Sequence, residues 1–389
     1  MMRLTDHCAI AGIGQTVYTR GTDRSTLELH LEACRRALAD AGLTVSDVDG
    51  VIPSSLAQGT VEDFIVNLGV QDLAFSTSVQ LGGASLIASV QNACMAITTG
   101  VASCVLIPAG RRGYSGERVS TGKAVTAASM ATVREFEFPF GNIGAAQWFA
   151  QAAQRHMFEF GTTSEQLGHV AVNSRANANL NKRALMYGKP MTLADHQNSR
   201  MITSPFRLFD CSLESDGAGA LVIVSAERGR DLRKPPVLIS GMGISHSDSP
   251  TSITQKPHIP GVPAIGVAAR RALGMAGIDV TDADCLIIHE GFTWYVIAAL
   301  EALGVVGMGE GGPYVEEGHI RLDGRTPVNP HGGALSEAHV SGMNHIIEAV
   351  RQLRDEVEPA RQVTGCENIL VVNEGNFFDG AVLSLRGAS

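Results

Sequence analysis

Apolar residues in the first part of the chain follow two alternating spacings. Short apolar runs at residues 8–16 and 104–110 are typical of buried strands, and the second is as uniformly apolar as strands inside parallel sheets. Residues 26–43 and 85–99 instead place apolar side chains at helical spacing. Two further strands are expected at residues 45–54 and 75–80. The alternation of strands and helices predicts an α/β fold.

The same pattern recurs in the second half of the chain. Residues 33–52 align without gaps on residues 268–287, with the same residue at about half of the positions. Three further landmarks keep the same order in both halves: residues 82–84 match 332–334, 105–110 match 370–375, and 216–218 match 379–381. We therefore predict that the chain is a duplication of one βαβαβαββ unit.

The halves differ mainly by one insertion. Residues 111–215 separate the last two landmarks in the first half, whereas only residues 376–378 separate them in the second. The predicted domains are an N-terminal half at residues 1–110 and 210–235, an inserted cap at 111–209, and a C-terminal half at 236–389. Helical patterns are expected within the cap at residues 145–160 and 164–180.

The cap also contains a basic, turn-rich stretch with Arg175, Lys182, Arg183 and Lys189. A cap over a cleft shared by two halves is a suitable place to hold a large substrate. For each of these side chains, an ordinary solvated charge is the alternative interpretation.

Composition narrows the class of protein. The chain has 389 residues, of which 44% are hydrophobic and 18% charged, so it can bury a large core. A net charge of −9 argues against nucleic acid as a partner, and no apolar run is long enough to span a membrane. Seven scattered cysteines show no metal-ligand or disulfide spacing. We expect a cytoplasmic protein without a metal site.

Cofactor motifs are missing from the glycine-rich turns. No GxGxxG with a following acidic residue and no GxxxxGK[ST] loop is present, so redox cofactors and ATP are not expected. A paired glycine turn at residues 332–333 instead precedes His339 and an apolar, helix-forming run. His289 follows another predicted strand. Histidine titrates near neutral pH, so these two side chains are candidates for acid/base chemistry.

Three stretches carry a resemblance to a known family. Residues 187–225 and the HEGF sequence at 289–292 resemble the sterol-carrier-protein and lipid-transfer-protein branch of the thiolase superfamily. Residues 317–354 look most like the retro-aldolases of bacterial steroid side-chain degradation. The resemblance implies a five-layered α/β/α/β/α fold with a cap, a homodimer built through the sheet edge of the first half, and an acyl-CoA substrate.

The residues that a thiolase uses for covalent chemistry are absent. A thiolase binds its acyl group covalently to a cysteine at the position of Gly83, and its second cysteine would fall near residues 373–375. His339 stands where thiolases have the histidine of their GHP motif, and His289 stands where they have that of HDCF. The steroid retro-aldolases have tyrosines at both positions, so this sequence departs from them twice.

An enolate chemistry without a covalent acyl intermediate fits this pattern. In a retro-aldol cleavage a base removes the proton of a β-hydroxyl, and the thioester enolate that forms needs an oxyanion hole and a proton donor. We assign His339 as the main acid/base and His289 as its partner. Backbone N–H groups near Gly83 or Gly375 are the expected further donors.

Other residues near these histidines have two interpretations. Glu290 is either a structural hydrogen-bonding carboxylate or an acid/base group, and Trp294 and Tyr295 either line an acyl pocket, with Phe377 and Phe378, or pack in the core. The other two candidate histidines are expected to have loop-packing and helix-surface roles: His331 and His345.

Three functions remain open. The leading one is an acyl-CoA retro-aldolase that cleaves a bulky β-hydroxyacyl-CoA, with coenzyme A as part of the substrate and no permanently bound cofactor. By resemblance it would work with a small OB-fold, zinc-ribbon partner. The alternatives are an acyltransferase or thiolase acting without the usual cysteine, and a non-catalytic subunit of a heteromeric complex.

Overall fold

The computed structural model describes residues 4–53, 59–116, 118, 131–246, 260–375 and 379–388. In this part of the chain one large mixed sheet has the strand order β3-β2-β4-β7-β1-β8-β11-β10-β9. Its strands are β1 (Cys8–Gln15), β2 (Gly50–Val51), β3 (Phe75–Ser76), β4 (Cys104–Arg112), β7 (Asp216–Ser225), β8 (Val237–His246), β9 (Cys285–Ile288), β10 (Asn368–Gly375) and β11 (Asp379–Gly387). A separate ribbon pairs β5 (Met201–Thr203) with β6 (Phe206–Arg207).

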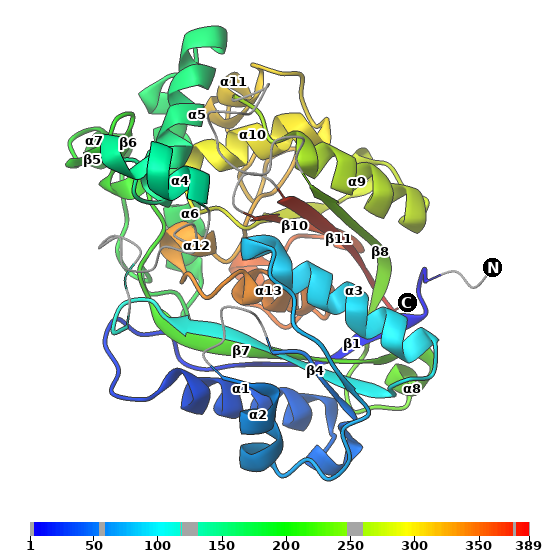
Figure 1. Cartoon of the computed structure of the whole chain (residues 1–389). Coiled ribbons are helices and arrows are strands. Elements are labelled where there is room, and N and C mark those ends of the chain that lie inside the picture. The colour runs from blue at the N-terminus through cyan, green and yellow to red at the C-terminus, as the bar shows by residue number, and fades with distance from the viewer. Residues whose placement is uncertain are drawn as a thin grey trace.

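Helices cover the outer faces of this sheet and also lie between its two layers of strands. They are α1 (Thr26–Ala41), α2 (Val61–Leu68), α3 (Ser85–Thr98), α4 (Ala131–Phe136), α5 (Ala145–Phe160), α6 (Ser164–Leu180), α7 (Leu193–Gln197), α8 (Ala226–Arg230), α9 (Pro263–Ala276), α10 (Thr293–Leu303), α11 (Gly311–Glu316), α12 (Gly333–Ser336) and α13 (Met343–Leu353). Figure 1 shows α3 and α13 between two layers of strands, with α1 and α2 outside one layer and α9 and α10 outside the other.

The apolar clusters confirm five layers. Side chains alternate along β4, so Cys104 and Leu106 pack under α1 and α2 while Val105 and Ile107 face α3 and α13. Along β10 the residue Val372 similarly belongs to the outer cluster with α9 and α10. Each strand layer is therefore buried on both faces, which explains the uniformly apolar strand sequences.

The two halves of the sheet repeat one topology. The order β2-β4-β7-β1 in the first half corresponds to β9-β10-β11-β8 in the second, and the halves join where β1 pairs with β8. The two segments that align without gaps also have the same structure, because the short 3-10 turns Val45–Asp47 and Val280–Asp282 occupy equivalent positions. Both preceding helices end at a left-handed glycine, Gly42 or Gly277. The predicted duplication is confirmed.

Two predicted strands are much shorter than expected. Residues 45–54 contain the 3-10 turn Val45–Asp47 and then only the two residues of β2, and residues 75–80 contribute only β3. The side chain of Asp47 accepts a hydrogen bond from the backbone N–H of Thr44 at 2.9 Å, which favours a turn here. The expected strand at 45–54 was wrong in length for this local reason, and its last residue, Ser54, lies outside the described part of the chain.

The inserted segment packs on the C-terminal half. The helices predicted at residues 145–160 and 164–180 are confirmed as α5 and α6. His156 of α5 places Nε2 2.9 Å from the carboxylate of Glu301 in α10. Asp210 accepts a hydrogen bond from the hydroxyl of Thr293 in α10 at 2.6 Å and lies 2.8 Å from Nε2 of His196 in α7. We propose to keep the domain boundaries inferred from the sequence, with the cap at residues 111–209.

One member of the basic stretch in the cap is structural. Arg175 is buried, its Nε donates to the hydroxyl of Ser336 at 3.2 Å, and one terminal nitrogen donates to the carbonyl oxygen of Lys189 at 3.1 Å. This side chain links α6 to α12, so it is neither a solvated surface charge nor a free substrate contact. Among the described residues, no helix is long and apolar enough to cross a membrane.

Candidate active site

The second Gly-Gly turn leads into a broken helix. Gly333 has φ of +62° and begins α12, which ends after Ser336. Ser341 and Gly342 then adopt positive φ values before α13 begins. The helix-forming run expected after this turn therefore forms two helices, because left-handed residues interrupt it. His339 lies in the resulting loop between α12 and α13.

The structure brings the two predicted catalytic histidines together. His289 directly follows β9, and its backbone N–H donates to the carbonyl oxygen of Val372 in β10 at 2.8 Å. Its ring centroid lies 5.3 Å from that of His339, with 58° between the ring planes. His339 is half-buried, whereas His289 is only 5% exposed. The pair is compact enough for both rings to contact one substrate group.

Two serines hold the His339 loop in place. The hydroxyl of Ser215 accepts the backbone N–H of His339 at 2.9 Å and donates to its carbonyl oxygen at 3.2 Å. The hydroxyl of Ser212 lies 3.1 Å from Nδ1 of the ring. Both serines belong to the stretch that carried the family resemblance, but their role was not predicted because it depends on tertiary contact. With Nδ1 occupied, Nε2 is the ring nitrogen left for other partners.

Gly83 forms a wall of this site. A Cβ atom at residue 83 would overlap the carbonyl oxygen of Glu374 and lie 3.1 Å from Nδ1 of His289. The carbonyl oxygen of Gly83 accepts a hydrogen bond from the side chain of Asn373 at 3.0 Å. Gly375 is equally crowded, because a Cβ there would overlap the carbonyl oxygen of Leu81. The first Gly-Gly turn and the end of β10 therefore meet beside His289, and the role of both glycines in an oxyanion hole stays a prediction.

The carboxyl of Glu290 contacts α12 and His345 rather than the histidine pair itself. Its carboxyl is fully buried, accepts the backbone N–H of Leu335 at 3.3 Å, and lies 3.1 Å from Nε2 of His345. Burial raises the pKa of Glu290 to about 8 and lowers that of His345 to about 3. Burial thus favours the neutral form of both groups. This placement favours the structural interpretation of Glu290.

The helix-surface role expected for His345 was wrong. α13 lies between the two strand layers, so His345 is fully buried, and its ring centroid lies 5.1 Å from that of His289. His331 is also buried, 4.8 Å from His345 between ring centroids. Helical periodicity cannot distinguish a surface helix from one covered on all sides, which explains the error.

Trp294 and Tyr295 lie in the outer apolar cluster. Both are fully buried, and their rings pack against Phe149 of α5 at centroid distances of 6.4 and 6.3 Å. This placement favours core packing between α10 and the cap over lining of a substrate pocket. Phe377 and Phe378, the other predicted pocket residues, lie outside the described part of the chain.

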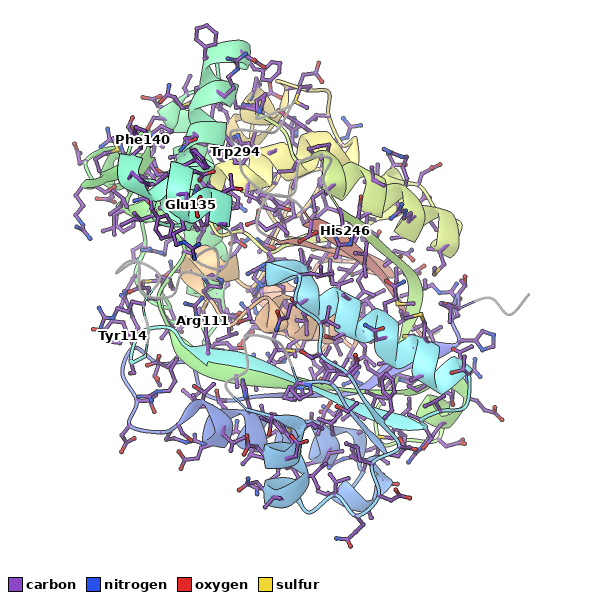
Figure 2. All side chains as sticks on the ribbon, viewed as in Figure 1. Arg111, Tyr114, Glu135, Phe140, His246 and Trp294 are labelled. Atoms are coloured by element: carbon purple, nitrogen blue, oxygen red, sulfur yellow. The ribbon has the colours of Figure 1, made fainter. Side chains whose placement is uncertain are left out.

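Burial, together with nearby positive charge, favours the neutral form of the two histidines. Burial lowers the pKa of both His289 and His339, and the positive charge of Arg111 lowers each further. Arg111 lies at the end of β4, where Figure 2 labels it. Sequence reasoning missed this residue, although a charged side chain directly after a buried strand is a usable signal. Among the described residues, no group of three or more His, Cys, Asp or Glu could hold a metal ion.

The duplicated five-layer fold with paired histidines beside two glycine turns defines a thiolase-like protein. Comparisons with known proteins agree. Residues 245–387 match the family model described as thiolase C-terminal domain-like. The human mitochondrial 3-ketoacyl-CoA thiolase superposes with a TM-score of 0.72 at 16% identity, covering all of both chains, which is a likeness of fold.

More similar relatives are lyases. A steroid side-chain-cleaving aldolase of Thermomonospora curvata is 39% identical over 91% of this chain and 92% of its own. The 17-hydroxy-3-oxo-4-pregnene-20-carboxyl-CoA lyase of Mycobacterium tuberculosis is 39% identical over 95% of this chain and 96% of its own. The solved Ltp2-ChsH2(DUF35) aldolase matches with a TM-score of 0.93 at 38% identity, covering 99% of both chains. The chain belongs to the thiolase superfamily, in its sterol-carrier-protein-like branch with the acyl-CoA aldolases, and the predicted resemblance is confirmed.

Proposed function

We propose that the protein is an acyl-CoA retro-aldolase that cleaves a β-hydroxyacyl-CoA into a ketone or aldehyde and a shortened acyl-CoA. The observation that carries this proposal is the His289–His339 pair beside Gly83, where a covalent thiolase would need a cysteine. Two neutral histidines next to backbone donors can move protons and stabilise an enolate. They cannot hold an acyl group as a thioester.

In the proposed reaction His339 acts first as the base. Its Nε2 takes the proton of the substrate's β-hydroxyl, the bond between Cα and Cβ breaks, and that electron pair becomes the thioester enolate while the carbonyl product leaves. Backbone N–H groups near Gly83 and Gly375, with His289, stabilise the enolate oxygen. Protonation of Cα by the imidazolium then completes the cycle, so protons and electrons balance without a cofactor.

The relatives support a bulky substrate and a second protein. Their names describe steroid side chains and a CoA thioester, so we assign a steroid or comparably large ring system attached to a β-hydroxyacyl-CoA. The solved aldolase is a complex of Ltp2 with ChsH2(DUF35), and we propose an equivalent DUF35-type partner with the OB-fold and zinc ribbon expected from the sequence. We also retain the expected homodimer as a proposal.

The proposed function is tested by the products. The purified protein, alone and with a co-encoded DUF35 protein, is mixed with matched β-hydroxyacyl-CoA and β-ketoacyl-CoA substrates, with and without free CoA, and products are identified by mass. We expect a ketone or aldehyde and a shortened acyl-CoA from the β-hydroxy substrate without added CoA. If only the β-keto substrate is cleaved, and only with free CoA, the protein acts as a thiolase and the proposal is wrong. A stable complex without turnover would identify a structural subunit.

The pH profile of cleavage follows from the lowered pKa values. A base must be neutral to accept a proton, and His339 and His289 both have a pKa below the ordinary 6.5. We expect kcat/KM to stay constant as pH falls from about 8 to 6.5 and to decrease only below that. Steady-state rates with a β-hydroxyacyl-CoA across this range check the prediction. An acidic limb centred at or above 6.5 would contradict it.

A further inference from the structure

A cavity lies next to the loop that carries His339, and neither histidine of the proposed pair lines it. It has a volume of about 700 Å³ and is formed by the end of β1, by α1, by the turn after α6, by the segment before β8 and by α13. Val17 in its lining is 72% exposed, so the cavity opens to solvent. We call it the basic cavity, because its lining contains Arg36, Lys182, Arg183, Arg233, Lys234 and Arg351.

The charge of this lining is opposite to that of the whole chain. Among the described residues that line the cavity, Asp40 is the single acidic residue against the six basic residues, although the chain carries a net charge of −9. Asp40 is already engaged by Lys234 at 2.6 Å and by Arg354 at 2.9 Å. A concentration of positive charge in a concave site attracts anions.

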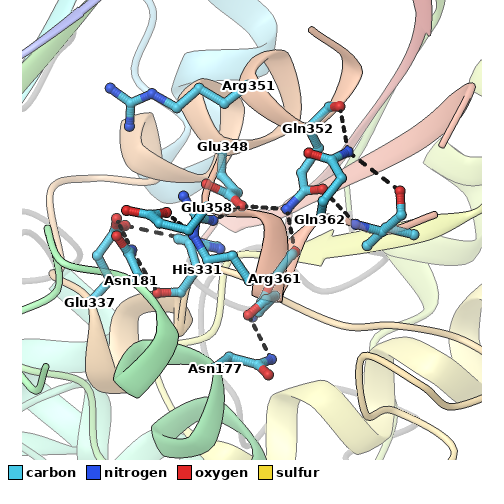
Figure 3. A network of polar contacts seen from close by, with 12 residues as sticks. Asn177, Asn181, His331, Glu337, Glu348, Arg351, Gln352, Glu358, Arg361 and Gln362 are labelled. Carbon is cyan, nitrogen blue, oxygen red and sulfur yellow. Dashed lines mark hydrogen bonds and ion pairs between the residues drawn. The ribbon is translucent and has the colours of Figure 1, made fainter. Parts of the chain in front are cut away.

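Lys182, Arg183 and Arg351 have at most one long ion pair each among the described residues. In the described part of the chain, Lys182 and Arg351 have no carboxylate within 4.0 Å, and the nearest carboxylate oxygen to Arg183 is 3.5 Å away on Glu358. One terminal nitrogen of Arg351 donates to the side-chain oxygen of Gln15, which leaves its other donors for a ligand. Figure 3 shows the guanidinium of Arg351 pointing away from the neighbouring buried network around Arg361. Burial and the adjacent charge of Arg183 lower the pKa of Arg351. The two positive charges therefore lie beside the same part of the cavity.

Tyr18 provides an unused hydrogen-bond donor in the same place. Its side chain is only 4% exposed, and its hydroxyl has no hydrogen-bond partner among the described residues. Burial and the charge of Glu337 raise the pKa of this hydroxyl, and the charges of Arg351 and Arg183 act against them by lowering it. Buried hydroxyls normally find a partner, so an unsatisfied one beside Arg351 and Arg183 indicates a missing acceptor.

We propose that the basic cavity binds a phosphate group, held by Tyr18, Lys182, Arg183 and Arg351. A phosphate offers several acceptor oxygens and a charge of up to two, and guanidinium groups bind it through paired hydrogen bonds. The volume also suits a small phosphorylated molecule rather than the bare ion alone. The proposal does not depend on the reaction assigned to the histidine pair.

The position of the cavity connects it to the histidine loop. The ring of Tyr18 packs with Ala338 and Val340, the two neighbours of His339 in the chain, and Leu185 adjoins this small cluster. A phosphate group bound to the Tyr18 hydroxyl therefore rests on the far side of the same loop. The bound ligand would hold the loop from the side opposite the proposed substrate.

Phosphate binding to the whole protein tests the proposal. Inorganic phosphate is titrated by calorimetry at constant ionic strength into the parent, into Lys182→Ala/Arg183→Ala, and into Arg134→Ala/Arg321→Ala, which removes equal charge from exposed sites elsewhere. We expect saturable binding to the parent and to the Arg134/Arg321 control, and binding at least about tenfold weaker in the Lys182/Arg183 variant. Equal affinity in all three proteins, or no saturable binding by the parent, would overturn the proposal.

Tyr18→Phe separates binding from folding. Because the hydroxyl has no partner in the protein, its removal is expected to leave the unfolding temperature without phosphate unchanged or higher, yet to weaken phosphate binding about three- to tenfold. Unchanged affinity in this variant would contradict the assigned contact. ADP identifies the source of the phosphate group: tighter binding than inorganic phosphate supports a nucleotide, and equal or weaker binding supports a free oxyanion.

Discussion

Replacing His339 by alanine is expected to lower kcat for cleavage of a β-hydroxyacyl-CoA by about 10²- to 10⁴-fold, the usual contribution of a positioned acid/base group. The imidazole is held by Ser212 at Nδ1 and faces His289, whose proposed role is at the enolate oxygen rather than at the β-hydroxyl. His289→Ala is expected to have an effect of similar size, because it removes the partner at the enolate. Steady-state rates and product analysis by mass measure both variants.

Folding must be unaffected for this result to be informative. His339 is half-buried in a loop held through its backbone, so the alanine variant should unfold at nearly the parental temperature. His319→Ala is the matched control, because His319 is a partly exposed histidine outside the proposed site, 3.0 Å from Glu317 and with its ring centroid 4.6 Å from that of Tyr314. Parental turnover in both His339→Ala and His289→Ala would show that the proposed active site is wrong. A decrease in the His319 variant would instead point to a general effect on folding.

Arg361→Met is expected to destabilise the protein by about 3–5 kcal/mol, the usual cost of leaving a buried charge without its partner. Arg361 is fully buried and forms ion pairs with Glu348 in α13 and with Glu358, the latter at 2.6 Å. Figure 3 shows these groups in one polar network with Gln352. Glu358 is partly exposed and can be hydrated after the change, but Glu348 is buried and cannot. Urea unfolding followed by circular dichroism measures the loss.

Two further variants check the cause of this destabilisation. Arg325→Met changes an exposed arginine and should alter the free energy of unfolding by less than about 0.5 kcal/mol. Combining Arg361→Met with Glu348→Met replaces the pair by apolar groups and should recover part of the loss, because no charge is then left stranded. A loss below about 1 kcal/mol in the single variant would contradict the expected result.

Much of the fold could be predicted because its signals are local. The helices at residues 145–160 and 164–180 begin and end where their apolar spacing and glycine or capping residues indicate. The duplication was visible because both halves keep the same helix, turn and strand without gaps. Family resemblance added what local patterns do not contain: the arrangement of five layers and the meeting of His289 with His339.

Tertiary contacts decided what the sequence did not predict. Ser212 and Ser215 reach the histidine loop from a distant segment, and nothing in their own neighbourhood in the sequence marks them. His345 has the spacing of a surface residue, but a second strand layer covers it. The break between α12 and α13 depends on positive φ at Ser341, a conformation that serine rarely adopts and that only the folded loop imposes.

The crowding around Gly83 has an evolutionary consequence. A single codon change could restore cysteine at this position, yet its Cβ would overlap the carbonyl oxygen of Glu374, which belongs to the backbone and cannot swing aside. Descent from a cysteine-dependent ancestor would therefore have required the end of β10 to move as well as the nucleophile to disappear. A single substitution of Gly83 by cysteine would therefore not restore cysteine-dependent thiolase chemistry, because the backbone at the end of β10 would have to move as well.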